Sequence, residues 1–397
     1  MTAAGAGTAS HTCTAVAGTA PHAGTTAALD AYLASFAEPV GYLNFGSYGP
    51  PSRDVVETIG RLASAASAGV PSSGLHAEDE RALAAVARLS GFDRSGVALT
   101  SSTSVGLMQI AFGLPRGEVV VSTAEFPSNL YAWWRSEEAG LTRVRPLPPV
   151  AGQPPAPVTP ERVAAEVGPD TVAVAVSAVD FRTGAVADLA GLREAVGDRL
   201  LVVDGIQGFG VVDADWTSAD ALVVGGQKWL RAGWGTGFVA LSSRALERLR
   251  PVLGGWTGVE GPSRYDGVPH EPAPGAQRLS VTNGSPFASG ALATALEQLE
   301  SVGVGAVASR IADTAGSLID GLEAAGVPVL SPVARAQRAG LVVAGVPAGT
   351  AAEVGARLEA AGVTATIHGG DRVRLSVHAT TTPAALDAAL TVLKGRA

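Results

Sequence analysis

Two residues of opposite charge each follow an apolar run that is typical of a buried β-strand. Asp204 ends the run 201–204, and Lys228 comes shortly after the run 221–224. Ligands of open α/β sheets bind beyond the carboxyl ends of the strands, so we expect these two side chains to meet in one crevice. Burial there lowers the pKa of a lysine amine, and the neutral amine forms a Schiff base with an aldehyde. The pair therefore predicts a lysine that carries an aldehyde cofactor.

Pyridoxal 5'-phosphate (PLP) is such an aldehyde, and its ring needs a carboxylate partner. A carboxylate that faces the pyridine nitrogen keeps it protonated, and the protonated ring accepts the electron pair left when a bond at Cα breaks. Asp204 is predicted to fill that role, with Lys228 as Schiff-base former and proton carrier. Each residue alone is equally compatible with a carboxylate that caps its loop or a solvated lysine. Together they favour a PLP site.

Three consecutive hydroxyl residues supply candidate donors for a phosphate. Ser102, Thr103 and Ser104 lie between the β-rich run 97–100 and an apolar helical pattern. Backbone amides and hydroxyls at the start of a helix bind phosphate well. The alternative is an ordinary N-cap, but capping uses a single side-chain oxygen and leaves the other hydroxyls unexplained. We therefore predict that these residues hold the phosphate of PLP.

The ordered set of motifs resembles the class V aminotransferase family of fold-type I PLP enzymes, which includes cysteine desulfurases, selenocysteine lyases and isopenicillin N epimerase-like proteins. The resemblance covers about residues 40–395. It rests on Tyr42-Leu-Asn44-Phe-Gly, Ser102-Thr103-Ser104, Glu125-Phe126-Pro-Ser-Asn, Thr183-Gly184, Asp204-Gly-Ile-Gln207, Gln227-Lys228-Trp-Leu, Gly284-Ser285-Pro286 and Arg372-Val-Arg374-Leu-Ser. The family implies an α/β fold with a large domain, built on a mostly parallel seven-stranded sheet, and a small C-terminal α+β domain.

The resemblance also implies roles for individual residues around the cofactor. Phe126 would stack on the pyridine face, Gln207 would hydrogen-bond the 3'-oxygen of the ring, and Gln227 would join the phosphate donors. Ser285 would reach the phosphate of a neighbouring subunit, which implies a homodimer with a shared active site. For Phe126 the alternative is ordinary core packing, because aromatic side chains are commonly buried.

Further residues are implied on the substrate side. Arg374 would clamp the substrate α-carboxylate as a two-pronged donor, although an arginine on a strand is equally compatible with a surface charge. Asn44, Phe181 and Arg182 are the other predicted substrate-binding residues. No metal site is predicted.

The chain departs from the desulfurase pattern in four places. Gln227 replaces the histidine that many relatives carry before the lysine, and Phe126 replaces the stacking histidine of desulfurases. Phe181 stands where desulfurases have asparagine, and Cys13 is the chain's single cysteine. Since a desulfurase needs a loop cysteine to accept sulfur, these departures disfavour persulfide chemistry and favour the epimerase-like branch.

Several reactions are compatible with these residues, because the orientation of the substrate on PLP decides which bond breaks. We predict a PLP-dependent enzyme that acts on an α-amino acid, with C–S β-lyase action on a cysteine S-conjugate in specialised metabolism as the first hypothesis. The alternatives are an aminotransferase, and an epimerase or decarboxylating deaminase. Outside these, the alternatives are a noncatalytic binding protein on the same fold and an NAD-dependent enzyme on a doubly wound sheet.

The elements that must position these residues form two groups. Buried strands are predicted at 97–100, 119–122, 172–177, 201–204, 221–224 and 237–241, with helices between them, which indicates a mostly parallel sheet. Residues 1–28 are predicted to be a flexible tail, 29–285 the PLP-binding domain with its interface segment, and 286–397 the small domain.

Composition excludes several classes of protein. A net charge of -8 and scattered basic residues argue against nucleic acid as a partner. No apolar stretch approaches the roughly 20 residues of a membrane helix, and the N-terminus lacks a signal-peptide pattern. The expected location is the cytoplasm.

Overall fold

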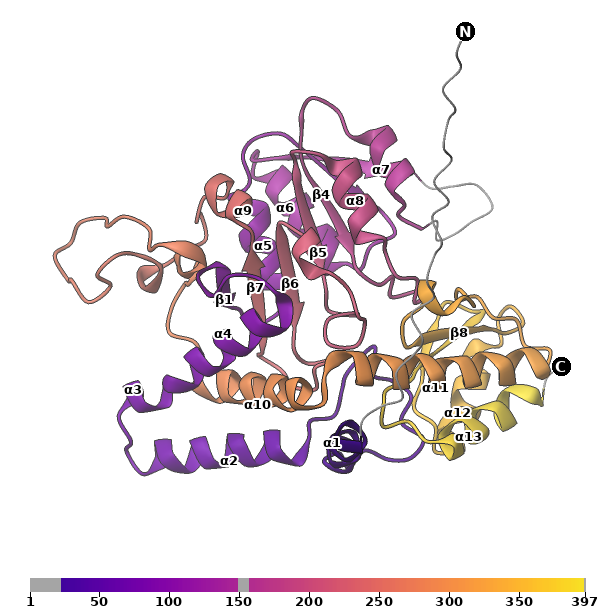
Figure 1. The fold of residues 1–397 in the computed structure, drawn as a ribbon. Helices are drawn as coiled ribbons and strands as arrows, with labels where there is room; N and C mark the ends of the chain where they lie inside the picture. The colour runs from indigo at the N-terminus through magenta and orange to yellow at the C-terminus, as the bar shows by residue number, and fades with distance from the viewer. Residues whose placement is uncertain (1–22, 149–156, 396–397) are drawn as a thin grey trace, which may run out of the picture.

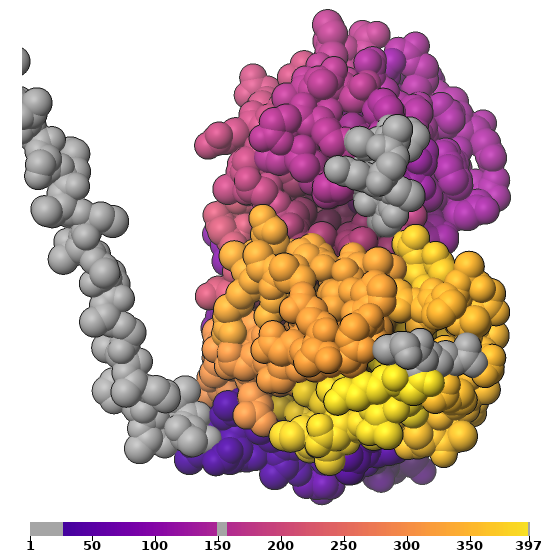
Figure 2. Space-filling model, turned by 90° about the vertical axis from the view of Figure 1, so that its right-hand side faces the viewer, coloured from indigo at the N-terminus to yellow at the C-terminus, as the bar shows by residue number. Residues whose placement is uncertain are grey.

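The computed structural model describes residues 23–148 and 157–395. Helix α1 (Ala23–Ala34) includes the last residues of the segment predicted to be a tail, and residues 1–22 lie outside the described part. Figure 1 shows the central sheet flanked by helices, with a smaller domain formed by the C-terminal part of the chain beside it. In Figure 2 the small domain, orange to yellow, lies directly beneath the magenta part of the large domain.

The large domain is built on a seven-stranded sheet with the order β1-β7-β6-β5-β4-β2-β3. Its strands are β1 (Val97–Leu99), β2 (Glu118–Ser122), β3 (Arg143–Leu147), β4 (Thr171–Ser177), β5 (Leu200–Asp204), β6 (Ala221–Gly225) and β7 (Gly237–Leu241). Strand β7 runs antiparallel to both of its neighbours, and the pairs from β6 to β3 are parallel. The predicted fold class is confirmed.

The inner strands of the sheet are buried on both faces, which explains why β5, β6 and β7 are continuous apolar runs, whereas β3 lies at the edge and is partly exposed. On β2, Val120 packs into one core cluster, whereas Val119 and Val121 pack into the other. Helices α5 (Thr103–Gly113) and α6 (Ser128–Glu138) supply Leu107 and Trp133 to the second cluster. Helices α4 (Ala77–Ser90), α8 (Leu189–Val196) and α10 (Pro286–Val302) cover the opposite face.

The small domain contains a three-stranded antiparallel sheet with β10 in the centre. Its elements are β8 (Leu341–Gly345), β9 (Thr366–His368), β10 (Arg372–Ser376), α11 (Val304–Ala324), α12 (Ala351–Ala360) and α13 (Pro383–Lys394). Helix α10 packs on α4 and on α2 (Arg53–Ser67), whereas α11 packs on α13 and β8. Helix α10, which begins at the predicted boundary, thus packs mainly on helices of the large domain. The division at residue 286 remains a proposal.

An N-terminal segment connects the two domains. Asn44 forms a parallel bridge with Ser376, the last residue of β10, and Tyr42 forms another with Thr364. A few residues later the Gly49 amide donates to the Gln227 carbonyl at 2.9 Å. The segment therefore links the small-domain sheet directly to the lysine loop, which is the stretch 226–236 between β6 and β7 that contains Lys228. No helix in the described part of the chain is long and apolar enough to span a membrane.

Candidate active site

Asp204 and Lys228 lie at the carboxyl ends of neighbouring parallel strands, as predicted. Asp204 ends β5, and Lys228 is the third residue after β6; β5 and β6 pair with Asp204 opposite Val223. Asp204 is 2% exposed and Lys228 is 9% exposed. The fold therefore holds both groups away from water at one edge of the sheet.

Burial shifts both groups toward their neutral forms. It lowers the pKa of Lys228 to about 8, with Arg374 adding to the effect and Asp204 opposing it. Burial raises the pKa of Asp204 to about 6, against a 3.0 Å hydrogen bond from the Ile206 amide and the charge of Lys228. At neutral pH the Asp204 carboxylate is mostly ionised, and Lys228 has an appreciable neutral fraction. This is the state that an aldehyde-binding lysine requires.

Phe126 faces the lysine from the loop that follows β2. The Lys228 Nζ lies 5.1 Å from the centroid of its ring. The ring also makes an edge contact with Phe181, at 5.1 Å and 87° between the rings. Phe126 is 40% exposed, so ordinary core packing does not describe it. A flat, accessible ring next to the lysine is suited to stack on a cofactor.

The three predicted phosphate residues divide into different roles at the start of α5. Ser102 caps the helix by accepting a 3.2 Å bond from the Val105 amide, and Ser104 is exposed. Thr103 is buried, and its Oγ1 has no partner among the described residues. A Cβ added at Gly225 would lie 2.9 Å from that oxygen and 2.6 Å from Gln227 Oε1. The space beside Gly225 is therefore bordered by Thr103, by Gln227 and by the N-terminus of α5.

Gln207 is placed in the site, but its amide has protein partners at both ends. Its Nε2 donates to the Gly46 carbonyl at 2.9 Å, and its Oε1 accepts from Trp229 Nε1 at 2.6 Å. Trp229 is the residue after Lys228, so Gln207 fixes the lysine loop. Its predicted bond to the 3'-oxygen of PLP stays a prediction, for which one amide hydrogen remains.

Arg374 is one of two buried arginines in the described chain, and the other is Arg231. Arg231 is paired with Glu38, whereas the bonds of Arg374 go to neutral groups: the Phe181 carbonyl at 3.0 Å, Ser47 Oγ at 2.8 Å and Thr366 Oγ1 at 3.1 Å. Burial lowers its pKa to about 10. A buried cation without a counter-ion is costly, so the site is complementary to an anion. The alternative of a surface charge is wrong.

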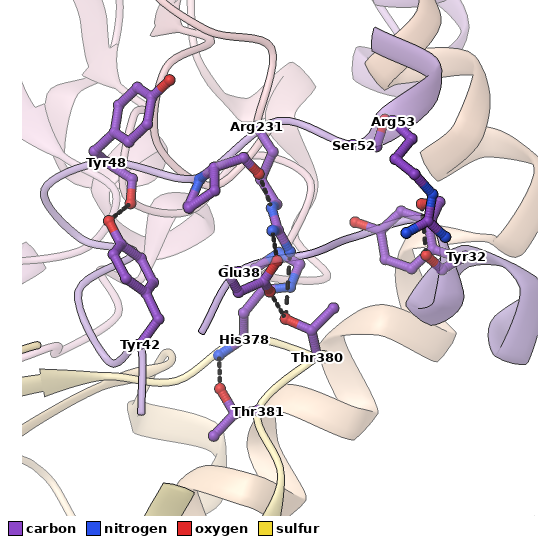
Figure 3. A network of polar contacts seen from close by, with 12 residues as sticks. Tyr32, Glu38, Tyr42, Tyr48, Ser52, Arg53, Arg231, His378, Thr380 and Thr381 are labelled. Carbon is purple, nitrogen blue, oxygen red and sulfur yellow. Dashed lines mark hydrogen bonds and ion pairs between the residues drawn. The ribbon is translucent and has the colours of Figure 1, made fainter. Parts of the chain in front are cut away.

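Arg231, three residues after Lys228, anchors the lysine loop, and Figure 3 shows its side chain between Glu38 and Thr380. Arg231 adopts a left-handed backbone conformation with φ of 58°, and it is 1% exposed. Its guanidinium contacts Glu38 at 2.5 Å, the Pro50 carbonyl at 2.6 Å and Thr380 at 3.3 Å. It also lies 3.5 Å from the Phe36 ring centroid. Contacts from three segments thus support a conformation that a non-glycine residue rarely adopts.

The structure places the remaining predicted residues as follows. Asn44 accepts a 2.5 Å bond from Thr366 Oγ1, next to Arg374, and Phe181 and Arg182 follow β4. Ser285 is exposed and caps α10 through the Ala288 amide at 3.4 Å. Its predicted contact with a second subunit stays a prediction.

Sequence reasoning missed four residues that line this region: Ser47, Glu125, Thr366 and His368. Glu125 accepts from the Ser177 amide at 3.0 Å and from its hydroxyl, and burial raises its pKa to about 7, with Asp204 adding to the rise. Thr366 and His368 alternate on β9, so they share one side of that strand. The signal available in the sequence was this pair of polar residues, Thr366 and His368, two positions apart and shortly before Arg374.

These residues fit PLP. Lys228 would hold the aldehyde, Asp204 the ring nitrogen, Phe126 the ring face, and Thr103, Gln227 and the α5 amides the phosphate. The unpartnered Thr103 hydroxyl beside Gly225 is the structural observation that supports the phosphate position. A cavity of about 620 Å³ between α8 and α11 contains none of the predicted site residues.

Comparison with known proteins agrees with this geometry. The model of the family "Aminotransferase class-V" matches residues 57–388. Isopenicillin N epimerase of Streptomyces clavuligerus is 33% identical over 180 residues, so the match spans 43% of this chain and under half, 45%, of that protein.

Solved structures show the same fold at low identity. The apo cysteine desulfurase of Thermococcus onnurineus NA1 superposes with a TM-score of 0.78 and 20% identity, covering 90% of this chain and 94% of that one. The cystine C–S lyase C-DES, in complex with cysteine persulfide, superposes with a TM-score of 0.80 and 22% identity, covering 89% and 97%. The family match decides against the noncatalytic and nicotinamide alternatives. The chain belongs to the class V aminotransferase family of PLP-dependent enzymes.

Proposed function

We propose that the protein is a C–S β-lyase that acts on a cysteine S-conjugate. The observation that carries this proposal is the absence of a thiol that could accept sulfur: Cys13 is the single cysteine of the chain, and residues 14–397 contain none. Lys228, Asp204 and Arg374 supply the machinery for breaking bonds of an amino acid, whereas sulfur transfer from the substrate to a loop cysteine would lack its acceptor, since residues 14–397 contain no cysteine. Elimination needs no such acceptor.

Each residue has a defined task in the proposed reaction. Arg374 binds the α-carboxylate with the two-pronged geometry of a guanidinium. Lys228 Nζ takes the proton from Cα, since its lowered pKa suits proton transfer near neutral pH. PLP, when bound, accepts electrons from the bond that breaks at Cα. The Cβ–S bond then breaks, and the sulfur leaves as a thiol once it gains a proton. Water completes the balance, and the products are pyruvate, ammonia and the thiol.

The C–S lyase C-DES supports the proposal as a protein of the same fold with a named C–S cleaving activity. Because C-DES is only 22% identical to this chain, the likeness supports a shared fold and not a shared substrate. We also propose that the enzyme is a cytoplasmic homodimer in which Ser285 of one subunit completes the phosphate site of the other.

A product analysis tests the proposal. The purified holoenzyme is incubated with a panel of amino acids and cysteine S-conjugates, and products are identified by mass. Equal amounts of pyruvate and thiol are expected from a conjugate. Amino transfer to an added keto acid would instead show an aminotransferase, an inverted amino acid an epimerase, and an aldehyde a decarboxylating deaminase.

A further inference from the structure

Three buried nitrogen atoms lie around Phe181. Its ring centroid is 5.4 Å from the guanidinium carbon of Arg182 and 6.0 Å from the ring centroid of His368. Its carbonyl accepts a 3.0 Å bond from Arg374. Within the described chain, Arg182 Nε, His368 Nε2 and Arg374 Nε are buried and have no hydrogen-bond partner. A buried N–H without an acceptor is destabilising, so these three nitrogen atoms call for an acceptor.

The charge around Phe181 is positive. Arg182 donates to the Ala124 carbonyl, and the partners of Arg374 are a carbonyl and two hydroxyls, so the bonds of both guanidinium groups go to neutral oxygens. The nearby Asp180 carboxylate is occupied by the backbone amides of Arg182 and Thr183, at 2.7 and 3.1 Å. Burial lowers the pKa of His368, and Arg374, Arg182 and Arg372 lower it further. A neutral imidazole thus stands beside Arg182 and Arg374, whose bonds go to neutral oxygens, whereas Arg372 is paired with Asp371 at 3.2 Å.

The α-carboxylate of a substrate would satisfy only some of these unpartnered nitrogen atoms. A carboxylate is satisfied by the fork of a single guanidinium, and Arg374 provides that fork. Arg182 lies on the ring side of Phe181, whereas Arg374 is bound to its carbonyl. The rings of Phe126 and Phe181 meet edge to face at 5.1 Å. They give the region an apolar wall that suits the carbon chain of a substrate.

Resting on the proposed function, we propose that Arg182 and His368 form a second anion-binding site, which holds a carboxylate on the thiol half of the substrate. Arg374 then holds the α-carboxylate, and Phe126 and Phe181 flank the atoms between. The preferred substrates are therefore cysteine S-conjugates whose leaving thiol carries an acid group. Arg182 binds that group by charge, and His368 adds a neutral hydrogen-bond donor.

A matched pair of probes tests this site in the holoenzyme. S-(2-carboxyethyl)cysteine and S-(2-carbamoylethyl)cysteine have the same size, and only the first has the distal charge. Dissociation constants come from the change in cofactor absorbance on binding, and pyruvate release is measured separately. A charge-assisted hydrogen bond contributes about 1.5–3 kcal/mol, so we expect the acid to bind about 10- to 100-fold more tightly than the amide.

Variants assign the preference to Arg182. Arg182→Gln should reduce the preference for the acid to less than about threefold, and Arg182→Lys should retain part of it, because the charge stays while the planar fork is lost. Arg135→Gln is the matched control, since Arg135 is exposed on α6 and pairs with Glu138. His368→Phe should weaken binding of the acid more than binding of the amide.

The outcomes for the anion site are distinct from those for the lyase reaction. Equal dissociation constants for the two probes in the wild-type enzyme, or no binding of either, would overturn the second site. Retention of the full preference by both Arg182→Gln and Arg182→Lys would overturn it as well. Absence of pyruvate from both probes counts against the lyase reaction, while the ratio of dissociation constants still decides the anion site. If Arg182→Gln fails to fold, the anion site is judged from the ratio of dissociation constants in the wild-type enzyme and in Arg182→Lys.

Discussion

Replacement of Glu38 by Gln removes the only carboxylate that contacts the buried Arg231 within the described chain. The ion pair measures 2.5 Å, its side chains are 1% and 8% exposed, and Thr380 donates to the other Glu38 oxygen at 2.5 Å. Removal of one partner of a buried pair leaves an uncompensated charge and costs about 3–5 kcal/mol. Glu300→Gln is the control, because Glu300 pairs with Arg88 at the surface and such pairs contribute about 0–1 kcal/mol.

Urea unfolding of the two holoenzyme variants measures this difference through the transition midpoint. The two variants should separate by about 2–5 kcal/mol, and equal midpoints would refute the role of Glu38. Burial tends to raise the pKa of Glu38, but Arg231 and Thr380 outweigh it and leave the pKa lowered. The stabilisation is therefore fully present above the unfolded carboxyl pKa of about 4.3 and is lost as pH falls through the folded value. The wild-type enzyme and Glu38→Gln should converge in stability in that acidic range.

Three further experiments test the cofactor and substrate contacts. Borohydride reduction should leave a phosphopyridoxyl group on Lys228 and not on Lys394, the chain's other lysine, when peptides are mapped by mass; label on Lys394 alone would contradict the assignment. PLP uptake by apoenzyme should accelerate as pH rises through about 8, because the neutral fraction of Lys228 increases; a flat profile would count against the lowered pKa. Thr103→Ala should weaken PLP retention about 10-fold, because it removes a hydrogen bond to the charged phosphate, whereas Ser104→Ala should not. Arg374→Gln should raise the KM for the amino-acid substrate about 10- to 100-fold. Equal PLP retention in the two alanine variants, or an unchanged KM, would reject the respective contact.

The parallel part of the sheet could be predicted because strands buried on both faces appear in the sequence as continuous apolar runs. The runs ending at Asp204 and before Lys228 are five buried residues each in the structure. Strand β3 was missed because it contains Arg143, Arg145 and Pro146 and lies at the edge of the sheet. Charged residues and proline suit an edge strand, but in a sequence they are typical of a loop.

The cofactor side of the site was accessible for the same reason, since strand ends mark ligand positions in this class of sheet. On the substrate side the family resemblance supplied Arg374 but not its hydrogen-bond partners, because these partners depend on contacts between residues distant in the sequence. Ser47 and Thr366 gain significance only through their hydrogen bonds to Arg374. The left-handed conformation of Arg231 has no local signal either, because the residue is neither glycine nor asparagine.

The segment 44–49 explains how the two sides of the site are kept in register. Ser47 contacts Arg374, the Gly46 carbonyl accepts from Gln207, and the Gly49 amide donates to Gln227. A Cβ added at Gly49 would lie 1.9 Å from the Lys228 carbonyl oxygen, so no side chain fits there without displacing the lysine loop. The same short stretch therefore contacts the arginine for the substrate carboxylate and the loop of the reactive lysine. Substitution of Gly49 by Ala should consequently impair both PLP attachment and substrate binding, although Gly49 has no side chain to contact either.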